Sequence, residues 1–476
     1  MKMNGTTLKV LGFPESPIMA ALLKIVNEEL KDHNESELTN ELSELAAHPA
    51  KFIEHPVYGT IAKELCKPSA DEDVIELNNA PLQVNAYGAD FIEAGAFSQM
   101  HNAARLPISV AAAVMPDAHQ GYGLPIGGVL ATKNAVIPYG VGVDIGCRMC
   151  LSIYEINPLL LEEKKAFFTR ELGAATLFGS GAGFKNPTAH EVIDHKLFNE
   201  IPLLKNLQSK AAVQLGTSGS GNHFAEFGVV TITEYDPTVD LQPGTYLGFL
   251  THSGSRGLGA NIAAHYTKIA KETCKLPKEA VNLAWLSLDS EAGMEYWLAM
   301  NFAGDYASAC HHVIHDKIAA QLKETPLKRI ENHHNFAWKE ILNGEEVIVH
   351  RKGATPAGKD VLGVIPGSMT APGFIVKGKG EVNSIQSASH GAGRLMSRTK
   401  AMESITHAEL KSILTDHGVT LIGGGLDEAP HAYKNIHEVM NAQQELVDVV
   451  GTFLPKIVKM DGGQQERGRK KRGNEE

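Results

Sequence analysis

VAAAVMPDAHQGYGLPIGGVLATKNAVIPYGVGVDIGCRMCLSIYEI, residues 110–156, gives the first indication of the architecture of this chain. Its apolar runs are short and are separated by Gly and Pro turns, a pattern typical of short β-strands. Within it, the segment VGVDIGCRM at residues 141–149 places Asp144 and Cys147 three residues apart, in a glycine-rich run with almost no other polar group. A carboxylate and a thiol in such surroundings indicate a functional site.

The composition is that of an ordinary globular protein. The chain has 476 residues, 43% hydrophobic and 21% charged, enough for one large domain or for two to three smaller ones. We expect no transmembrane helix, because no run of about 18 apolar residues occurs, and no signal peptide. Five cysteines at irregular spacing argue against a disulfide framework, which predicts reduced thiols and a cytoplasmic location.

The net charge of −11 argues against a nucleic-acid-binding protein, since such proteins are usually basic. Bound divalent cations or a local basic patch would remove this objection. The 46 glycines predict tight turns and close approaches of the backbone to other groups.

Residues 1–75 are expected to form an N-terminal helical accessory segment. Ser16 is a candidate N-cap, Pro17 occupies the first helical position, and apolar residues then recur at helical spacing. Residues 35–48 predict a second helix. Residues 76–460 predict one α+β domain with mixed and antiparallel sheets and surrounding helices, and residues 461–476 a disordered basic tail.

Within the main domain the sequence alternates between strand-like and helix-like segments. We expect a helix at 158–170, a strand, loop and helix within 247–270, one or two long helices at 279–323, a hairpin turning at Asn343-Gly344, strands within 361–388 and a helix at 434–452.

Polar residues that lie inside apolar, glycine-rich loops are the candidates for chemistry. They occur at five places: Asp144 and Cys147 in VDIGC; Asn222, His223 and Glu226 in GTSGSGNHFAEFG; His252 in THSGSRGLG; His334 and Asn335 in ENHHNFAW; and His390 in SASHGAGR.

Each of these residues also has a simpler interpretation. Cys147 alone is more often a small buried hydrophobic residue, and His252 or His334 alone an ordinary loop histidine. Cys147 and Cys150 form a CxxC that is a redox candidate, but in a strand the two would point to opposite faces. His333 and the Cys310-His311-His312 cluster are expected to be ordinary helix or surface residues, and the role of His119 stays open.

Taken together, the candidates indicate a metal site. One thiolate, one carboxylate and three imidazoles suit transition metals, and five ligands exceed the need of one tetrahedral ion. Two metals with a bridging thiolate fit the count better, and a metal pair can stabilise both oxygens of a displacement at phosphorus. The glycine loops would offer backbone N–H groups to phosphate oxygens. None of them matches a nucleotide-binding fingerprint.

Nine motifs occur in an order that resembles the RtcB family of GTP-dependent RNA ligases. They are VMPDAHQGYGLPIGG, VGVDIGC, GTSGSGNHFAEF, THSGSRGLG, HHN, KGATPA, IPGSM, SASHGAGRLMSR and EAPHAYKNI. The resemblance runs from about residue 80 to Lys459. It implies an RtcB-like catalytic domain over 76–460 that joins an RNA 3′-phosphate or 2′,3′-cyclic phosphate to a 5′-hydroxyl, with GTP and two manganese ions, in RNA repair or tRNA maturation.

The resemblance also implies roles for particular residues. His390 would attack the GTP α-phosphorus and become guanylylated, and neutral imidazole is a competent nucleophile near pH 7. Glu226 suits guanine because a carboxylate accepts from both N1–H and the 2-amino group. Arg394 and Arg398 are candidates to neutralise phosphate. Asp144, Cys147, His223, His252 and His334 would hold the metals, with Cys147 bridging; Asn222, Glu226, Asn335, Ser368, Ala392, Tyr433 and Lys459 would bind GTP or GMP.

Four features depart from the family pattern. Gly373 stands where a serine that contacts guanylate is expected, and Arg148 where glycine is common. The N-terminal segment and the basic tail at 467–472 are additions, and the tail is either an RNA-phosphate contact or a solvated extension. The natural RNA, the nucleotide selectivity, the oligomeric state and the need for an activating partner stay open.

Two other functions remain in competition at this stage. A dinuclear phosphodiesterase or phosphatase acting on RNA ends would need the metals but neither His390 nor a guanine pocket. A non-catalytic RNA-end-binding or chaperone-like protein would not need all five candidate ligands.

Overall fold

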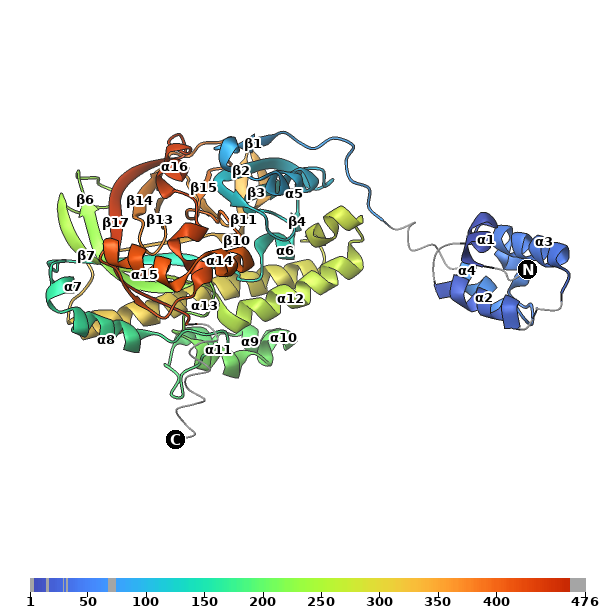
Figure 1. The fold of residues 1–476 in the computed structure, drawn as a ribbon, viewed down its shortest axis with the longest axis horizontal. Coiled ribbons are helices and arrows are strands. Elements are labelled where there is room, and N and C mark those ends of the chain that lie inside the picture. Colours follow the sequence, from blue (N-terminus) through green and yellow to red (C-terminus); the bar gives the residue numbers. More distant parts are fainter. Residues whose placement is uncertain (1–3, 14–16, 29, 31–32, 67–73, 463–476) are drawn as a thin grey trace. The chain divides into compact units, whose positions relative to one another are not determined.

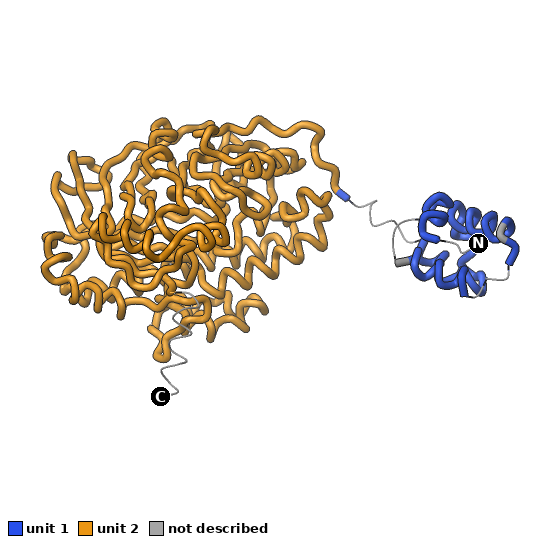
Figure 2. Tube along the Cα trace, in the orientation of Figure 1, with its two compact units in different colours: residues 1–74 blue, residues 75–476 orange. Residues whose placement is uncertain are grey.

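The structure is a computed structural model that describes residues 4–13, 17–28, 30, 33–66 and 74–462. Its contacts divide the chain into two compact units, residues 1–74 and 75–476 (Figure 2). The expected N-cap Ser16 and the basic tail at 467–472 lie outside the described residues. Among the described residues, no helix combines the length and apolar character that a membrane span requires.

The first unit is a small helical bundle. It contains α1 (Gly5–Val10), α2 (Pro17–Glu28), α3 (Glu35–Ala47), the 3₁₀ turn η1 (Pro49–Phe52) and α4 (Gly59–Leu65). The apolar faces of these helices bury Leu8, Leu22, Leu42 and Leu45 against one another, which gives the unit a core of its own.

The second unit contains a five-stranded sheet in the order β1 (Val84–Ala86), β2 (Ser109–His119), β3 (Ile126–Thr132), β11 (Glu345–Lys352) and β10 (Asn335–Leu342). β10 and β11 form the predicted hairpin. Asn343 and Gly344 at its turn both have positive φ, 52° and 85°, as a type I′ turn requires.

An eight-stranded sheet carries the larger part of this unit. Its order is β13 (Leu362–Ile365), β14 (Gly373–Gly378), β17 (Val447–Met460), β6 (Phe224–Ile232), β7 (Gly244–Ser253), β5 (Arg148–Tyr154) and β9 (Lys328–His333), with β16 (Thr420–Ile422) beside β17. β1 pairs with β2 and β16 with β17 in parallel, and the other pairs of the two sheets are antiparallel. The predicted α+β class with mixed sheets is confirmed.

Helices cover one face of the eight-stranded sheet. The long helices α12 (Arg256–Thr273) and α13 (Glu291–Leu322) lie side by side (Figure 1). Phe227 of β6, Phe249 of β7 and Ile457 of β17 pack with Ile314 of α13 and with α8 (Lys165–Ala175). Because side chains alternate along a strand, their neighbours in sequence point to the opposite face, where the functional residues lie.

Short elements complete the unit. The helices are α5 (Ala94–Ala104), α6 (Pro138–Val141), α7 (Leu160–Glu163), α9 (Leu197–Glu200), α10 (Pro202–Lys205), α11 (Gln208–Gln214), α14 (Arg398–Ser404), α15 (His407–Asp416) and α16 (Ile436–Asn441); the 3₁₀ turns are η2 (Ala89–Phe91), η3 (Glu191–Asp194), η4 (Lys278–Leu283), η5 (Leu426–Glu428) and η6 (Pro430–Ala432); and β4 (Ala135–Val136) pairs with β8 (Leu286–Ser287), as β12 (Ala354–Pro356) does with β15 (Ser387–Ser389).

Most of the predicted elements are present. Helix α8 with α7, the strand, loop and helix formed by β7 and α12, and the long helix α13 all occur where the sequence indicated them. The helix predicted at 434–452 is wrong beyond Asn441, because β17 begins at Val447. VDVVGTF is rich in β-branched residues, and pairing between β14 and β6 decides its conformation.

Two glycines paired across the sheet make room for one aromatic ring. Gly228 of β6 lies opposite Gly248 of β7. A Cβ atom on Gly248 would lie 2.8 Å from Cε2 of Phe453, and one on Gly228 would lie 2.6 Å from Cζ of the same ring. Phe453 is fully buried, so its ring has no free space into which it could move.

We predict that Gly248→Ala lowers the free energy of unfolding by about 1–3 kcal/mol, because the added methyl overpacks the sheet against Phe453. Urea unfolding followed by circular dichroism measures this change. Gly173→Ala is the matched control, since Gly173 lies exposed in α8 with no atom within 4 Å of its added Cβ. The control should leave stability unchanged or raise it by up to about 1 kcal/mol. Equal stability of the two variants would contradict the packing argument.

Candidate active site

The five predicted metal ligands converge at one end of the eight-stranded sheet. Cys147 Sγ lies 3.5 Å from His223 Nε2 and 3.2 Å from His252 Nε2. The Asp144 carboxylate is 2.9 Å from His223 Nε2, and His334 Nε2 is 3.1 Å from His252 Nε2. The structure therefore brings together donor atoms that lie as much as 190 positions apart in the sequence.

The loop that carries Asp144 and Cys147 is held tightly between α6 and β5. Gly146, with a φ of 67°, donates to the Asn335 carbonyl at 2.7 Å, and the Cys147 carbonyl accepts from the His334 amide at 2.9 Å. A Cβ atom on Gly146 would lie 2.9 Å from the Cα atom of Gly304 in α13. Only glycine allows this backbone conformation at this distance from the helix.

Backbone carbonyls fix the orientation of two of the imidazoles. His223 Nδ1 is 2.7 Å from the Ser218 carbonyl, and His252 Nδ1 is 3.1 Å from the Asn222 carbonyl. A carbonyl only accepts, so each Nδ1 carries a proton, and each Nε2 is the atom that faces the cluster and can bind a cation once it is unprotonated. This is the usual outer-shell arrangement of metal-binding histidines.

His334 completes the indication of a metal site. Its Nδ1 is buried and has no hydrogen-bond partner in the part of the chain that the structure describes. Its Nε2 faces the Nε2 of His252, whose lone pair already points into the cluster. A buried ring with an unmet hydrogen-bonding atom fits coordination of a cation better than a purely structural role.

Electrostatics favour a bound cation at this place. Burial opposes charge on the Asp144 carboxyl, but the charge of His223 and hydrogen bonds from His223 and Cys147 outweigh it and lower the Asp144 pKa. Burial, and next the charge of Asp144, raises the pKa of the Cys147 thiol well above its usual range. Burial and neighbouring imidazoles lower the pKa of His252 and His334. Neutral imidazoles are ready ligands, and a coordinated cation deprotonates such a thiol.

A second group of metal-type side chains lies on the opposite face of the same strands. Cys150, His311 and His315 are fully buried and close together. His311, expected to be an ordinary helix or surface residue, belongs instead with His315 to a buried network. Thr251 Oγ1 lies 2.6 Å from His311 Nδ1 and 2.9 Å from His315 Nε2.

The hydrogen bonds of this network run in one direction. Arg329 Nε donates to the Ser152 hydroxyl, which donates to His315 Nδ1. His315 Nε2 donates to the Thr251 hydroxyl, which donates to His311 Nδ1. His311 Nε2 donates to the Ser253 carbonyl, where the run ends. Each imidazole thus uses both nitrogens. The group has its hydrogen bonds satisfied without a metal, and it fixes the end of β7 next to His252.

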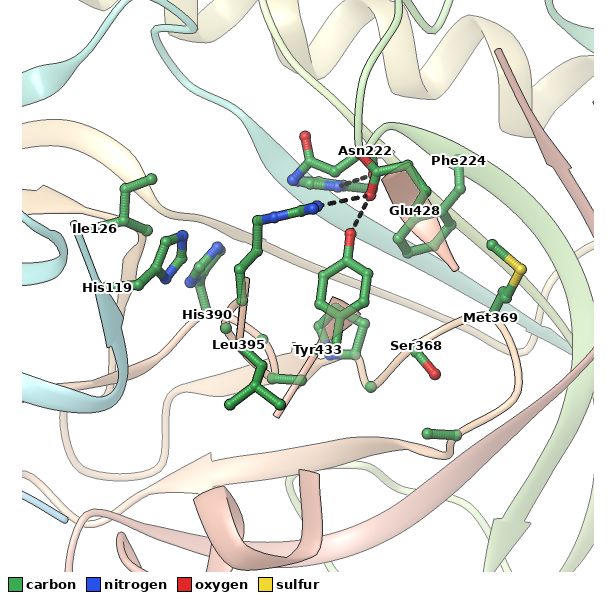
Figure 3. A pocket seen from close by; sticks show the side chains of 18 of the residues that line it. His119, Ile126, Asn222, Phe224, Ser368, Met369, His390, Leu395, Glu428 and Tyr433 are labelled. Carbon is green, nitrogen blue, oxygen red and sulfur yellow. Dashed lines mark hydrogen bonds and ion pairs between the residues drawn. The ribbon is translucent and has the colours of Figure 1, made fainter. Parts of the chain in front are cut away.

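Most of the predicted nucleotide-binding residues line one cavity of about 630 Å³ beside the metal cluster. Its walls include Asn222, Glu226, Ser368, Ala392, Tyr433 and His390, and also His252 and Gly373. Figure 3 shows His390 and His119 at one end and Phe224, Met369 and Ser368 at the other. Glu226 is 4% exposed, and its burial raises its pKa well above the ordinary value.

An acidic and aromatic cluster forms another wall of the cavity. The Glu428 carboxylate accepts from the Tyr433 hydroxyl and from Arg398, and it lies 3.5 Å from Arg394 Nη1 (Figure 3). Arg398 Nη1 also donates to Asp427 at 2.6 Å. Both guanidinium groups are therefore compensated by carboxylates as the protein stands. Sequence reasoning did not identify Glu428, although it opens the EAPHAYKNI motif.

His390 is oriented by a carboxylate that sequence reasoning also missed. Asp117 is fully buried, and its Oδ2 accepts from His390 Nδ1 at 2.6 Å and from the amides of His390 and Gly391 at 3.1 and 3.3 Å. Burial alone would raise the Asp117 pKa, but His390 lowers it below the ordinary value. An ionised Asp117 keeps the proton on Nδ1, which leaves Nε2 as the nucleophilic atom.

Comparison with known proteins agrees with this site. The family model described as "tRNA-splicing ligase RtcB" matches residues 99–199 and 193–461. The chain belongs to the RtcB family. It is 32% identical over 414 residues to the RNA-splicing ligase RtcB of Escherichia coli strain K12, covering 80% of this chain and 97% of that one. It is 32% identical over 434 residues to the tRNA-splicing ligase RtcB of Nanoarchaeum equitans, covering 76% of this chain and 90% of that one.

Two residues expected to bind the nucleotide lie elsewhere in this RtcB-family chain. Lys459 belongs to β17, on the same face as Ile457, and its ammonium donates to the carbonyls of Gly173 and Thr176 at 2.8 and 2.7 Å, at the end of α8. Its neighbours Val458 and Met460 line the cavity instead. Asn335 accepts from the Gly353 amide at 2.8 Å and lies 3.4 Å from the Asp144 carbonyl, behind the metal loop.

The two single-residue departures from the RtcB pattern, Arg148 and Gly373, have different surroundings. Arg148 points away from the cavity and donates to the Gly304 carbonyl at 2.8 Å and to Glu331 at 3.2 Å, which ties the metal loop to α13 and β9. Gly373 lines the cavity, and a Cβ atom there would meet nothing closer than 3.4 Å. The backbone therefore leaves room for the missing serine.

We predict that Cys147→Ala weakens manganese binding by more than about 100-fold, the upper range for loss of an outer-shell partner. Elemental mass spectrometry after gel filtration in a fixed manganese concentration measures the bound metal per chain. Cys150→Ala is the matched control, because Cys150 is equally buried, in the same CxxC, but on the opposite face. Unchanged metal content in Cys147→Ala, or equal loss in both variants, would refute a metal role for Cys147.

Proposed function

We propose that this protein is an RNA ligase that joins RNA 3′-phosphate or 2′,3′-cyclic phosphate ends to 5′-hydroxyl ends, using GTP, a His390–GMP intermediate and two manganese ions. The observation that carries the proposal is the His390–Asp117 pair, which opens into the same cavity as His252 and Glu226. The names of the RtcB relatives support RNA ligation as the reaction.

The first step transfers GMP to the protein. Nε2 of His390 forms a bond to the α-phosphorus of GTP, the bond from that phosphorus to the oxygen bridging to the β-phosphate breaks, and pyrophosphate leaves. Asp117 keeps the proton on Nδ1 and stabilises the positive charge that develops on the ring. The amide hydrogen bonds to Asp117 hold both the residue and the ring in place before substrate arrives.

The next two steps use the RNA ends. A 3′-phosphate oxygen attacks the phosphorus of the GMP, the phosphorus–nitrogen bond to His390 breaks, and GMP becomes attached to the RNA end. The 5′-hydroxyl oxygen then attacks the RNA 3′-phosphorus, GMP leaves with the electron pair, and a phosphodiester results. A cyclic phosphate end must first be opened by water to the 3′-phosphate.

The residues that would hold the metals are Asp144, Cys147, His223, His252 and His334. Bound manganese ions would neutralise phosphate charge, which also explains how a chain with a net charge of −11 can accept RNA. The Irving–Williams order places manganese below iron and zinc in affinity, so the metal content of the isolated protein depends on metal supply.

Glu226, Asn222, Ser368, Ala392 and Tyr433 are the proposed GTP-binding residues, because all of them line the cavity that contains His390. Glu226 would accept from N1–H and the 2-amino group of guanine, a pattern that adenine does not offer. We place the protein in the cytoplasm, with RNA ends as its partners and no membrane attachment. The five cysteines are all free, and Cys147 and Cys150 lie in groups with histidines, which supports a reducing compartment.

We predict a single GMP adduct on the wild-type protein after incubation with GTP and manganese, and none on His390→Ala. Intact-mass spectrometry measures both. Asp117→Asn should slow adduct formation by about 100-fold or more, because the amide no longer enforces the reactive tautomer. Absence of the adduct from a wild-type protein with bound metal would overturn the ligase mechanism in favour of a dinuclear phosphodiesterase or phosphatase.

We predict that the KM for GTP rises as the pH falls through the raised pKa of Glu226. The ionised carboxylate, present above that pKa, accepts both guanine hydrogen bonds, and the protonated form loses one of them. Glu226→Gln should remove this component of the pH profile and reduce the preference for GTP over ATP by roughly tenfold to hundredfold. Both proteins are measured at the same pH values, so that any effect of pH on metal binding is the same in both and the difference between the profiles reports on Glu226. Identical profiles for the two proteins would exclude Glu226 from guanine recognition.

A further inference from the structure

An exposed aromatic side chain lies at the edge of the cavity and has no part in the steps above. Tyr122, in the loop between β2 and β3, is 69% exposed and yet belongs to the cavity lining. Large apolar side chains this exposed are commonly binding contacts when they lie at a pocket.

The loop that carries Tyr122 is held rigidly. The Gln99 side chain accepts from the Gly121 amide at 3.0 Å and donates to the Gly121 carbonyl at 2.5 Å. Glu93 accepts from the Gln120 amide at 2.5 Å, and Lys352 donates to the Tyr122 carbonyl. The backbone is therefore fixed on both sides of Tyr122 while its ring remains in solvent, so binding on the ring costs little conformational entropy.

The surroundings of Tyr122 combine aromatic rings with positive charge. The ring of Tyr139 lies 6.2 Å away, centroid to centroid, at an angle of 37°. The ammonium of Lys352 lies 5.0 Å and that of Lys271 5.5 Å from the centroid of Tyr139. The Lys352 ammonium is buried and donates to the carbonyls of Tyr122 and Tyr139, and the Lys271 ammonium donates to Asn282, so both cations support the aromatic pair from behind. The exposed ring of Tyr122 is the part of this surface open to a ligand, and an exposed aromatic face is the usual platform on which a base of single-stranded nucleic acid stacks.

The two residues that flank this loop lie beside His390, the proposed nucleophile. His119, which precedes it, and Ile126, which follows it, lie beside His390 at one end of the cavity (Figure 3). A Cβ atom on Gly353 would touch both Ile126 and His390. Two residues proposed to bind GTP, Glu226 and Ser368, line other parts of the cavity, with Ser368 at the far end in Figure 3. Tyr122 is thus close to the place where an RNA end must meet His390.

We propose that Tyr122 is an RNA-binding residue that stacks on a nucleobase at the reacting RNA end. The proposal rests on the proposed ligase function, since it names a contact of that same site with its substrate. Stacking requires the ring and not the hydroxyl, and it acts only in the steps that involve RNA. The guanine of GTP is the competing occupant, and the test separates the two.

The test compares Tyr122→Ala, Tyr122→Phe and Tyr122→Trp with the wild type in two assays. Intact mass after addition of GTP and manganese, without RNA, measures adduct formation. Ligation of RNA with a 3′-phosphate end and a 5′-hydroxyl end measures the KM for RNA. Tyr235→Ala is the matched control, because Tyr235 is 51% exposed but does not line the cavity.

Tyr122→Ala should raise the KM for RNA about tenfold or more and leave the rate of adduct formation unchanged. Tyr122→Phe, Tyr122→Trp and the control Tyr235→Ala should keep a KM for RNA close to that of the wild type. Two further RNAs each lack the base of one terminal nucleotide, at the 3′-phosphate end or at the 5′-hydroxyl end. The RNA that lacks the stacking base should bind the wild type as weakly as intact RNA binds Tyr122→Ala. An unchanged KM for RNA, or a slower adduct formation in Tyr122→Ala, overturns the proposal, the latter in favour of guanine.

Failure of the ligase function is distinguishable from failure of the stacking contact. If the wild type forms no adduct, the proposed function fails. Fluorescence anisotropy of a labelled oligoribonucleotide with each kind of end still tests the contact, because binding requires no reaction. Equal dissociation constants for wild type and Tyr122→Ala in that assay would refute stacking whatever the reaction is.

Discussion

The alternation of side chains along β5, β7, β6 and β17 organises the whole catalytic unit. One face of these strands packs on α8 and α13, and the other carries His252, Glu226 and the cavity wall. The constraint is strict, because a shift of register by one residue would exchange the two faces. It places Cys147 and Cys150, only three positions apart, in two separate polar clusters, one facing the cavity and one facing the helix.

Desolvation determines the chemistry of the cavity face. Cys147, His223, His252 and His334 are buried where water cannot solvate a charge, Asp144 lies partly exposed beside them, and backbone carbonyls fix two of the imidazoles with Nε2 inward. In such a place a neutral thiol and neutral imidazoles have no strong interaction with one another, and a cation gives all of them a common partner. The same burial keeps Asp117 as a pure acceptor for His390, because three donors already converge on its Oδ2.

The sequence was informative where a residue type is unusual in its local setting. Asp144, Cys147 and the three histidines stand out as polar residues in apolar glycine loops, and the structure gathers all five. Asp117 and Glu428 did not stand out, since their roles depend on distant partners: His390 lies 273 positions from Asp117, and Arg394 lies 34 positions from Glu428. The orientation of Lys459 depends on the register of β17. The helix predicted over 434–452 wrongly includes the start of β17, residues 447–452, because the pairing of distant strands cannot be seen in a local pattern.

The one-way run of hydrogen bonds from Arg329 through His315, Thr251 and His311 to the Ser253 carbonyl has a consequence for how this chain can evolve. Its polarity is set at both ends, by a guanidinium that only donates and a carbonyl that only accepts. Replacing one member leaves a donor or an acceptor unpaired on each side, and every buried group left unpaired lowers the free energy of unfolding by about 1–3 kcal/mol. Its members are therefore epistatic: sequences drifting at these positions must change several of them together or keep them all.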